Sequence, residues 1–166
     1  MTRILVLSDT HIPTAADNLS AVIAKEAKKS DCCLHAGDFV SYSVFEALSS
    51  FKKTYGVYGN MDQERIKIEL PEQQILKFED VTLSLTHGAG HPANLIGYLQ
   101  NKFSEKIDEI DIFVFGHSHC ATDEEIDKKI YFNPGSPTDK VFACYRSYGI
   151  LEINGSEIKR RIIKIE

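Results

Sequence analysis

Near its start the chain reads Arg3-Ile4-Leu5-Val6-Leu7-Ser8-Asp9-Thr10-His11. An unbroken apolar run such as Ile4 to Leu7 is typical of a strand that is buried on both faces of a sheet. Asp9 and His11 follow this strand directly, and ligands in open α/β sheets bind outside the carboxyl ends of the strands. The opening of the chain therefore predicts an α/β protein with a polar site at one edge of a sheet.

Strands and helices alternate at first, and strands dominate the later part of the chain. Strands are expected at 3–8, 32–35, 54–58, 73–78, 81–86, 112–115, 130–132, 142–153 and 157–165. Helices are expected after a cap at Asp17 or Asn18 (with Leu19, Val22, Ile23 and Ala27 inward), after a cap at Ser41 or Ser43, and over 93–105. This order of elements indicates an α/β core with a mixed sheet or two packed sheets.

Three local patterns refine this expectation. Glu79-Asp80 joins two of the strands in a hairpin, and Thr82, Ser84 and Thr86 of its second arm alternate with apolar residues, so that one face should be wetter. Asn154-Gly155 predicts a two-residue turn, because both residues tolerate positive φ. The charged residues of the last strand are typical of an exposed sheet edge.

Composition and charge exclude several classes of protein. A chain of 166 residues, 43% hydrophobic and 26% charged, fits a single globular domain, expected to span residues 1–166. No apolar run reaches the ~18–20 residues of a membrane span, and the N-terminus lacks the apolar region of a signal peptide, so we expect a cytoplasmic protein with no membrane contact. The net charge of −5 argues against binding to duplex nucleic acid.

The four cysteines, Cys32, Cys33, Cys120 and Cys144, show no CxxC spacing. Adjacent cysteines rarely bridge each other, so we expect four reduced thiols in a reducing compartment. A zinc site at Cys120 and His119 is disfavoured, because no second cysteine lies nearby to complete it.

Polar clusters follow five of the expected strands, each beside a glycine or at i, i+2 spacing. In chain order they are Asp9-Thr10-His11, Gly37-Asp38, Gly59-Asn60, His87-Gly88 and Gly116-His117-Ser118-His119. The i, i+2 pairs should point to one side of an extended chain, and the glycines should allow the backbone to turn sharply. We therefore expect all five clusters to converge, although they span more than a hundred residues.

These clusters resemble the signature of the calcineurin-like metallophosphoesterases, which reads D-x-H, G-D, G-N, H-G and G-H-x-H in that order. The stretch Asn133-Pro134-Gly135-Ser136 is similar to the small single-domain phosphodiesterase branch of that family. The resemblance implies an α/β fold, a metallophosphatase-like sandwich of two mixed β-sheets flanked by helices. It also implies a homodimer or a larger homo-oligomer.

The resemblance further implies two divalent metal ions. The first would be held by Asp9, His11, Asp38 and His119, and the second by Asp38, Asn60, His87 and His117. Asp38 would bridge the two ions, since a carboxylate has lone pairs for both. Oxygen and imidazole ligands without thiolate suit Mn²⁺, which we expect first, and also Ni²⁺, Zn²⁺, Fe or Mg²⁺.

The reaction implied is hydrolysis of a small or nucleotide-like phosphodiester. A hydroxide between the two metals would attack phosphorus in line, with Asp38, Asn60 and His117 as the catalytic residues. Many members of the family carry a histidine after Asn60 that is proposed to protonate the leaving group. Here the residue is Met61, followed by Asp62, and this G-N-x-D form resembles the small phosphodiesterases. Methionine cannot donate a proton, so turnover should be slow with poor leaving groups.

Four further residues are candidates for contacts with the substrate or with the metal ligands. Asp62 belongs to the G-N-x-D form, and His35 is either a partner of a metal ligand or a hydrogen-bonded core histidine. His91 lines the substrate cleft or lies in a surface loop. Arg146 binds a phosphate or is a solvated strand residue.

Two alternatives to a phosphodiesterase stay open. The same fold serves as a protein-interaction scaffold in the retromer complex, but that scaffold departs from the full histidine set, which this chain keeps. A phosphomonoesterase of the protein-phosphatase kind is less well supported, because the chain is short and lacks the histidine after Asn60.

Overall fold

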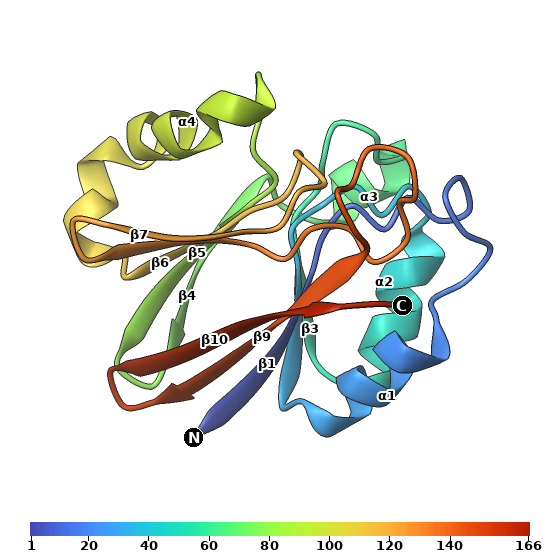
Figure 1. The fold of residues 1–166 in the computed structure, drawn as a ribbon, viewed down its shortest axis with the longest axis horizontal. Coiled ribbons are helices and arrows are strands. Elements are labelled where there is room, and N and C mark those ends of the chain that lie inside the picture. Colours follow the sequence, from blue (N-terminus) through green and yellow to red (C-terminus); the bar gives the residue numbers. More distant parts are fainter.

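Two five-stranded mixed β-sheets form the centre of the protein, and helices cover their outer faces (Figure 1). The structure is a computed structural model that describes residues 1–166. The first sheet contains, in spatial order, β10 (Glu157–Lys164), β9 (Ser147–Asn154), β1 (Thr2–Leu7), β2 (Cys32–His35) and β3 (Thr54–Gly56). The second contains β4 (Gln73–Phe78), β5 (Val81–Thr86), β6 (Ile112–Val114), β8 (Lys129–Asn133) and β7 (Thr122–Ile126). The expected sandwich of two mixed sheets is therefore confirmed.

Three apolar layers hold the sandwich together. Val6, Leu34, Leu83 and Val114 are among the residues that fill the space between the two sheets. The outer face of the first sheet is covered by α1 (Ala21–Lys29), α2 (Tyr42–Phe51) and α3 (Glu64–Glu69). The outer face of the second sheet is covered by α4 (Leu95–Lys102), which is flanked by 3₁₀ helices at Pro92–Asn94 and Ser104–Glu109. None of these helices has the length and apolar character needed to cross a lipid bilayer.

The strand directions bring the carboxyl ends of six strands to one edge of the sandwich, and the polar clusters follow five of them. β1, β2 and β3 run parallel in the first sheet, and β5, β6 and β8 run parallel in the second. Past the strand ends the pairing continues, because Asp9 N donates to Gly37 O and His11 N donates to Asp38 O, each at 3.0 Å. The loops that carry the polar clusters are therefore fixed to one another by backbone hydrogen bonds.

Several element boundaries differ from the sequence prediction for local reasons. Ser20 caps α1 in place of Asp17 or Asn18, because its Oγ accepts the N–H of Ile23 at 3.4 Å, and Val22 consequently lies on the outer face with 46% exposure. The helix expected over 93–105 is shorter, since 3₁₀ turns flank it. The turn between β9 and β10 is Gly155-Ser156, one residue later than expected, because Asn154 pairs with Glu157.

The second arm of the β4–β5 hairpin is buried on both faces, which corrects the expected wetter side. Ser84 and Thr86 are buried, at 0% and 2% exposure. Ser84 is paired with Phe113 of β6, whose ring packs with Leu99 and Phe103 against the α4 side of the sheet. The next α-helix along the chain, α4, lies on this side of the sheet.

Segments of polar sequence account for the other differences. β7 reads Thr-Asp-Glu-Glu-Ile and forms the exposed edge of the second sheet, and neither it nor α3 was expected. The strand expected over 142–153 begins only at Ser147. The residues before it form a loop, because Asp139 Oδ1 accepts the N–H groups of Val141 and Phe142 at 2.7 and 3.1 Å and turns the chain.

Candidate metal centre

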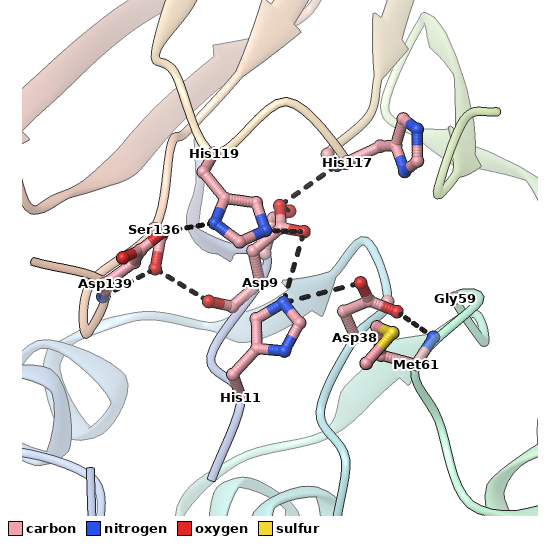
Figure 2. A network of polar contacts seen from close by, with 12 residues as sticks. Asp9, His11, Asp38, Gly59, Met61, His117, His119, Ser136 and Asp139 are labelled. Atoms are coloured by element: carbon pink, nitrogen blue, oxygen red, sulfur yellow. Dashed lines mark hydrogen bonds and ion pairs between the residues drawn. The ribbon is translucent and has the colours of Figure 1, made fainter. Parts of the chain in front are cut away.

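Side chains from both sheets meet at the carboxyl edge of the sandwich. One ligand atom from each of Asp9, His11, Asp38 and His119 lies within 4.8 Å of every other. Asp9 and His11 follow β1, Asp38 follows β2, and His119 follows β6 of the other sheet. Figure 2 shows the four side chains directed toward one another. They are the four residues that the sequence assigned to the first metal ion.

Asp9 supplies one unsatisfied oxygen to this group. Its Oδ2 accepts the hydroxyl of Ser8 and the backbone N–H of His117, the latter at 3.0 Å. Its Oδ1 is buried without a hydrogen-bond partner and lies 3.4 Å from His119 Nε2. His11 Nε2 is likewise buried and has no hydrogen-bond partner. Such atoms are costly to bury in isolation, so the pair has the character of a cation site.

Asp38 stands where the two predicted metal sites meet (Figure 2). Its Oδ1 accepts the backbone N–H of Met61 at 2.8 Å. Its Oδ2 lies 3.4 Å from His11 Nε2 and 3.3 Å from His87 Nε2. Because Oδ1 is already engaged, the oxygen placed to serve both sites is Oδ2.

Three acceptor atoms converge in the second predicted set. His87 Nδ1 donates to Ala36 O at 2.7 Å and His117 Nε2 donates to Gly90 O at 2.9 Å, since a carbonyl oxygen can only accept. The remaining nitrogens, His87 Nε2 and His117 Nδ1, lie 3.1 and 3.2 Å from Asn60 Oδ1. In the neutral imidazoles these are all lone-pair atoms. Ligand atoms about 2.1 Å from a shared cation lie roughly 3.0–3.4 Å apart, so the spacing fits a second cation.

Burial and neighbouring charges both shift the pKa values of the ligands. Burial lowers the pKa of His87, but the hydrogen bond to Asp38 and the negative charges of Asp9 and Asp38 outweigh it and raise the pKa to about 9. Burial raises the pKa of Asp9. In the metal-free protein a proton on His87 therefore separates the converging acceptors, and a bound cation would take the place of that proton.

The backbone of the ligand loops is not extended, contrary to the expectation from the i, i+2 spacing. Asp9, His11, His117 and His119 have φ of 53°, 43°, 71° and 57°, and Asp38 has φ of 58°. These left-handed conformations turn the side chains toward a common point. Gly59 is required for lack of space and not for a flexible turn, because a Cβ there would lie 2.2 Å from Asp38 Oδ1.

Asp62 and His35 support the loops that carry the predicted metal ligands, through hydrogen bonds to backbone N–H groups and to the Thr10 hydroxyl. Asp62 Oδ2 accepts the N–H groups of Asp38 and Gly59 at 3.0 and 2.7 Å, and its Oδ1 accepts the N–H of Val40 at 2.7 Å. His35 Nδ1 accepts the N–H of Gly37 at 3.2 Å, and Nε2 lies 3.1 Å from the Thr10 hydroxyl. Burial and the charge of His87 lower the pKa of His35, so the ring stays neutral.

The structure places His91 and Arg146 outside the lining of the cavity next to the predicted metal ligands. His91 is exposed and its Nδ1 accepts the N–H of Ala93 at 3.2 Å, so it caps a 3₁₀ helix. Arg146 donates from Nη2 to Glu166 O at 2.8 Å and lines a separate hollow with Lys140 and Thr138. Neither side chain lines the cavity next to the metal ligands.

The loop after β8 supplies residues that the sequence reasoning missed (Figure 2). Asp139 Oδ2 accepts a hydrogen bond from His119 Nδ1, which leaves His119 Nε2 facing Asp9. Such carboxylate–histidine pairs orient metal ligands. Ser136 Oγ and Thr138 Oγ1 donate to the carbonyls of Asp9 and Thr10 at 2.7 and 2.6 Å. The sequence signal for these residues is the stretch Asn133-Pro134-Gly135-Ser136, because the same loop continues to Asp139.

A cavity of about 570 Å³ opens above these ligands. Its lining residues are His11, Thr14, Ala15, Asp38, Asn60, Met61, Pro92, His117, Ser118, His119, Asp139, Val141 and Phe142. Met61, Val141 and Phe142 are 58%, 79% and 76% exposed and give it an apolar rim. The lining contains no lysine or arginine.

Cys120 also departs from expectation. The Sγ of Cys144, which is distant in sequence, lies 3.3 Å from the Sγ of Cys120. The expectation that no second cysteine lies near Cys120 is therefore wrong in three dimensions.

Comparison with known proteins agrees with the geometry. The model of the calcineurin-like phosphoesterase superfamily domain matches residues 2–156. A phosphodiesterase from Methanocaldococcus jannaschii is 26% identical over 147 residues, which cover 80% of this chain and 82% of that protein. The solution structure of a Thermotoga maritima protein is 32% identical, with a TM-score of 0.77, over 99% of this chain and 100% of that one.

The fold is also shared with more distant proteins. Vps29 from Chaetomium thermophilum is 19% identical, with a TM-score of 0.78, over 98% of this chain and 97% of that one. At this identity the likeness is one of fold alone. The match of the family model over almost the whole chain, together with the convergence of the ligand set at one edge of the sandwich, shows that the chain belongs to the calcineurin-like phosphoesterase superfamily.

Proposed function

We propose that this protein is a metal-dependent phosphodiesterase with two divalent metal ions, which hydrolyses small or nucleotide-like phosphodiesters. The observation that carries the proposal is the convergence of seven oxygen and nitrogen ligands from two sheets, with Asp38 Oδ2 between the two sets. When bound, two cations supply Lewis-acid polarisation of the phosphoryl group and a hydrolytic nucleophile from water. The ligand atoms are of the kinds that Mn²⁺, Ni²⁺, Zn²⁺, Fe and Mg²⁺ accept.

The protein's own groups hold the ligands in place before any substrate arrives. The backbone N–H of Met61 fixes Asp38, and Asp139 orients His119. Asn60 and His117 line the cavity, where they can meet a phosphoryl oxygen. These contacts reduce the reorganisation that binding of metal and substrate requires.

The charged groups that line the cavity favour a diester over a monoester. The lining contains no lysine or arginine that could pair with a negative charge left over after the phosphoryl group meets the cations. A monoester is largely a dianion at neutral pH, whereas a diester carries one negative charge. The diester leaves no second charge without a partner, so it is the better match.

The rim of the cavity indicates what the leaving group should be. Met61 occupies the position where a histidine could have protonated the departing oxygen, and its exposed side chain cannot do so. An acidic leaving group needs no such protonation. Val141 and Phe142 also line the cavity and offer apolar surface to a planar or aromatic group.

The proposal is tested by adding Mn²⁺, Ni²⁺, Zn²⁺ or Mg²⁺ in turn to metal-stripped protein and assaying bis(p-nitrophenyl) phosphate and p-nitrophenyl phosphate. Metal-restored cleavage that favours the diester supports it. Asp38→Asn should lose both metals and the activity, and Asp80→Asn, an exposed carboxylate far from the site, is the matched control. Two tightly bound metals in Asp38→Asn would contradict the shared ligand.

Two other outcomes of this assay would support the alternative functions. Preference for the monoester would identify a phosphomonoesterase. Stoichiometric metal binding without turnover of either substrate would favour a protein-interaction scaffold, the reading to which the distant Vps29 likeness of fold corresponds.

A further inference from the structure

Two thiols lie side by side at the edge of the candidate metal centre. Cys120 and Cys144 are 24 residues apart in the chain, yet their Sγ atoms are separated by only 3.3 Å. Cys120 directly follows His119, and Cys144 lies in the loop that leads from Asp139 to β9. The pair therefore joins the loop after β6 to the loop that forms one wall of the cavity.

The surroundings of this pair suit reaction with a molecule from solution. Cys144 is exposed and Cys120 is partly exposed. A disulfide has an S–S length of about 2.05 Å, so the sulfurs need to approach by roughly 1.3 Å. Residues 137–146 contain no helix or strand that resists such a movement.

The other two cysteines provide an internal contrast. Cys32 and Cys33 are both buried, at 5% and 0% exposure. They are successive residues of β2, and Cys32 packs between the sheets whereas Cys33 packs beneath the helices. Their side chains point to opposite faces of the sheet, so these thiols are protected and cannot bridge.

We propose that Cys120 and Cys144 form a reversible intramolecular disulfide, a modification site driven by small-molecule disulfides of the glutathione class. The Cys144 thiolate attacks the oxidised small molecule, forming a mixed disulfide and releasing one small thiol. The Cys120 thiolate then attacks Cys144 Sγ and releases the second small thiol. The two protein thiols lose two hydrogens and two electrons, and one small disulfide becomes two thiols.

The bond would tie the cavity wall to the metal-ligand loop. The loop that Cys144 anchors carries Asp139, which bonds His119, and Phe142, which lines the cavity. Oxidation would restrict this loop, and amide hydrogen exchange of residues 139–146 should slow by about tenfold. Formation of the disulfide does not depend on the hydrolytic reaction, so failure of the proposed function would leave the disulfide unaffected.

The experiment equilibrates the intact protein in buffers of rising ratio of oxidised to reduced glutathione and quenches it with acid and alkylating agent. Peptide mass spectrometry should find Cys120 linked to Cys144, a loss of two hydrogens in the intact mass, and full reversal by dithiothreitol. Cys32 and Cys33 should stay reduced. Cys120→Ser and Cys144→Ser should each abolish the linked peptide and leave a glutathione adduct on the remaining partner.

Three results would overturn the proposal. They are two free thiols at the most oxidising ratio, only glutathione adducts on Cys144 in the unmodified chain, or a Cys144–Cys144 bond between two chains. A linked peptide without any slowing of amide exchange at 139–146 would refute the proposed restriction of the loop.

Discussion

Replacing Asp62 tests whether this carboxylate holds the ligand loops in place. Asp62 is 5% exposed and accepts three backbone N–H groups, those of Asp38, Val40 and Gly59. Removing an acceptor from a buried donor costs about 1–3 kcal/mol. In Asp62→Ala all three donors lose their acceptor, so we expect unfolding to become easier by about 3–5 kcal/mol, a large part of the stability of an ordinary domain.

Asp62→Asn makes the prediction sharper. The amide oxygen can replace Oδ2, which serves Asp38 and Gly59, but the NH₂ group cannot accept from Val40. One bond is lost instead of three, and the loss should be about 1–2 kcal/mol. The order of stability should therefore be Asp62, then Asn, then Ala.

The assay is urea unfolding followed by circular dichroism with a chelator present, so that bound metal contributes nothing to stability. Asp80→Ala is the control, because Asp80 is exposed and its side chain makes no hydrogen bond, and it should change stability by less than about 0.5 kcal/mol. A loss below about 1 kcal/mol in Asp62→Ala, or equal losses in the Ala and Asn variants, would refute the reasoning.

Three further predictions concern the site itself. Met61→His should raise the rate on an alkyl diester relative to bis(p-nitrophenyl) phosphate, since it restores a proton donor while keeping the backbone N–H; an unchanged ratio of rates would show that the missing acid is irrelevant. Asp139→Asn should weaken metal binding by about 10–100-fold in calorimetry because it loosens the orientation of His119, and equal affinity would exclude that role. The pKa of His87 is raised from 6.5 to about 9 in the folded metal-free protein, so protonation of His87 stabilises the fold fully below pH 6.5, and this effect is lost as the pH rises to about 9. The urea concentration at the midpoint of unfolding should therefore fall over that range, and it should fall less in His87→Gln. Parallel curves for the two proteins would rule out His87 as the cause.

The convergence of polar side chains was easier to predict from the sequence than the path of the chain around them. Asp9, Asp38 and His119 were identified because each follows a buried strand, and burial of a strand is encoded in consecutive apolar residues. β7 was missed because an exposed edge strand has no such run. The burial of Ser84 was missed because alternating polar and apolar residues predict a wetter face, and the sequence of the strand does not show that α4 lies on that side of the sheet.

The supporting groups were harder to predict than the ligands for a related reason. Asp139 and Ser136 act through a loop that has no periodicity, and their partners are a side chain and a carbonyl more than a dozen residues away. The pairing of Cys120 with Cys144 likewise depends on where two loops pass each other. The stretch that begins at Asn133 carries part of the family resemblance, and the structure shows that it holds the loop of Asp9 in place. The expected homo-oligomer and the cytoplasmic location stay predictions.

The geometry of the site is set by the backbone before metal binds. Asp9, His11, Asp38, His117 and His119 all adopt left-handed φ, a conformation that costs about 1–2 kcal/mol for a residue with a Cβ. The strain persists because the surrounding contacts over-determine these loops, through the hydrogen bonds of Asp62 and the hydroxyls of the loop after β8. The free energy of strand pairing and core packing therefore offsets the strain in the absence of metal. It follows that a metal ion would meet ligands already turned inward, and that the substitutions most damaging to metal affinity include residues that never touch the metal.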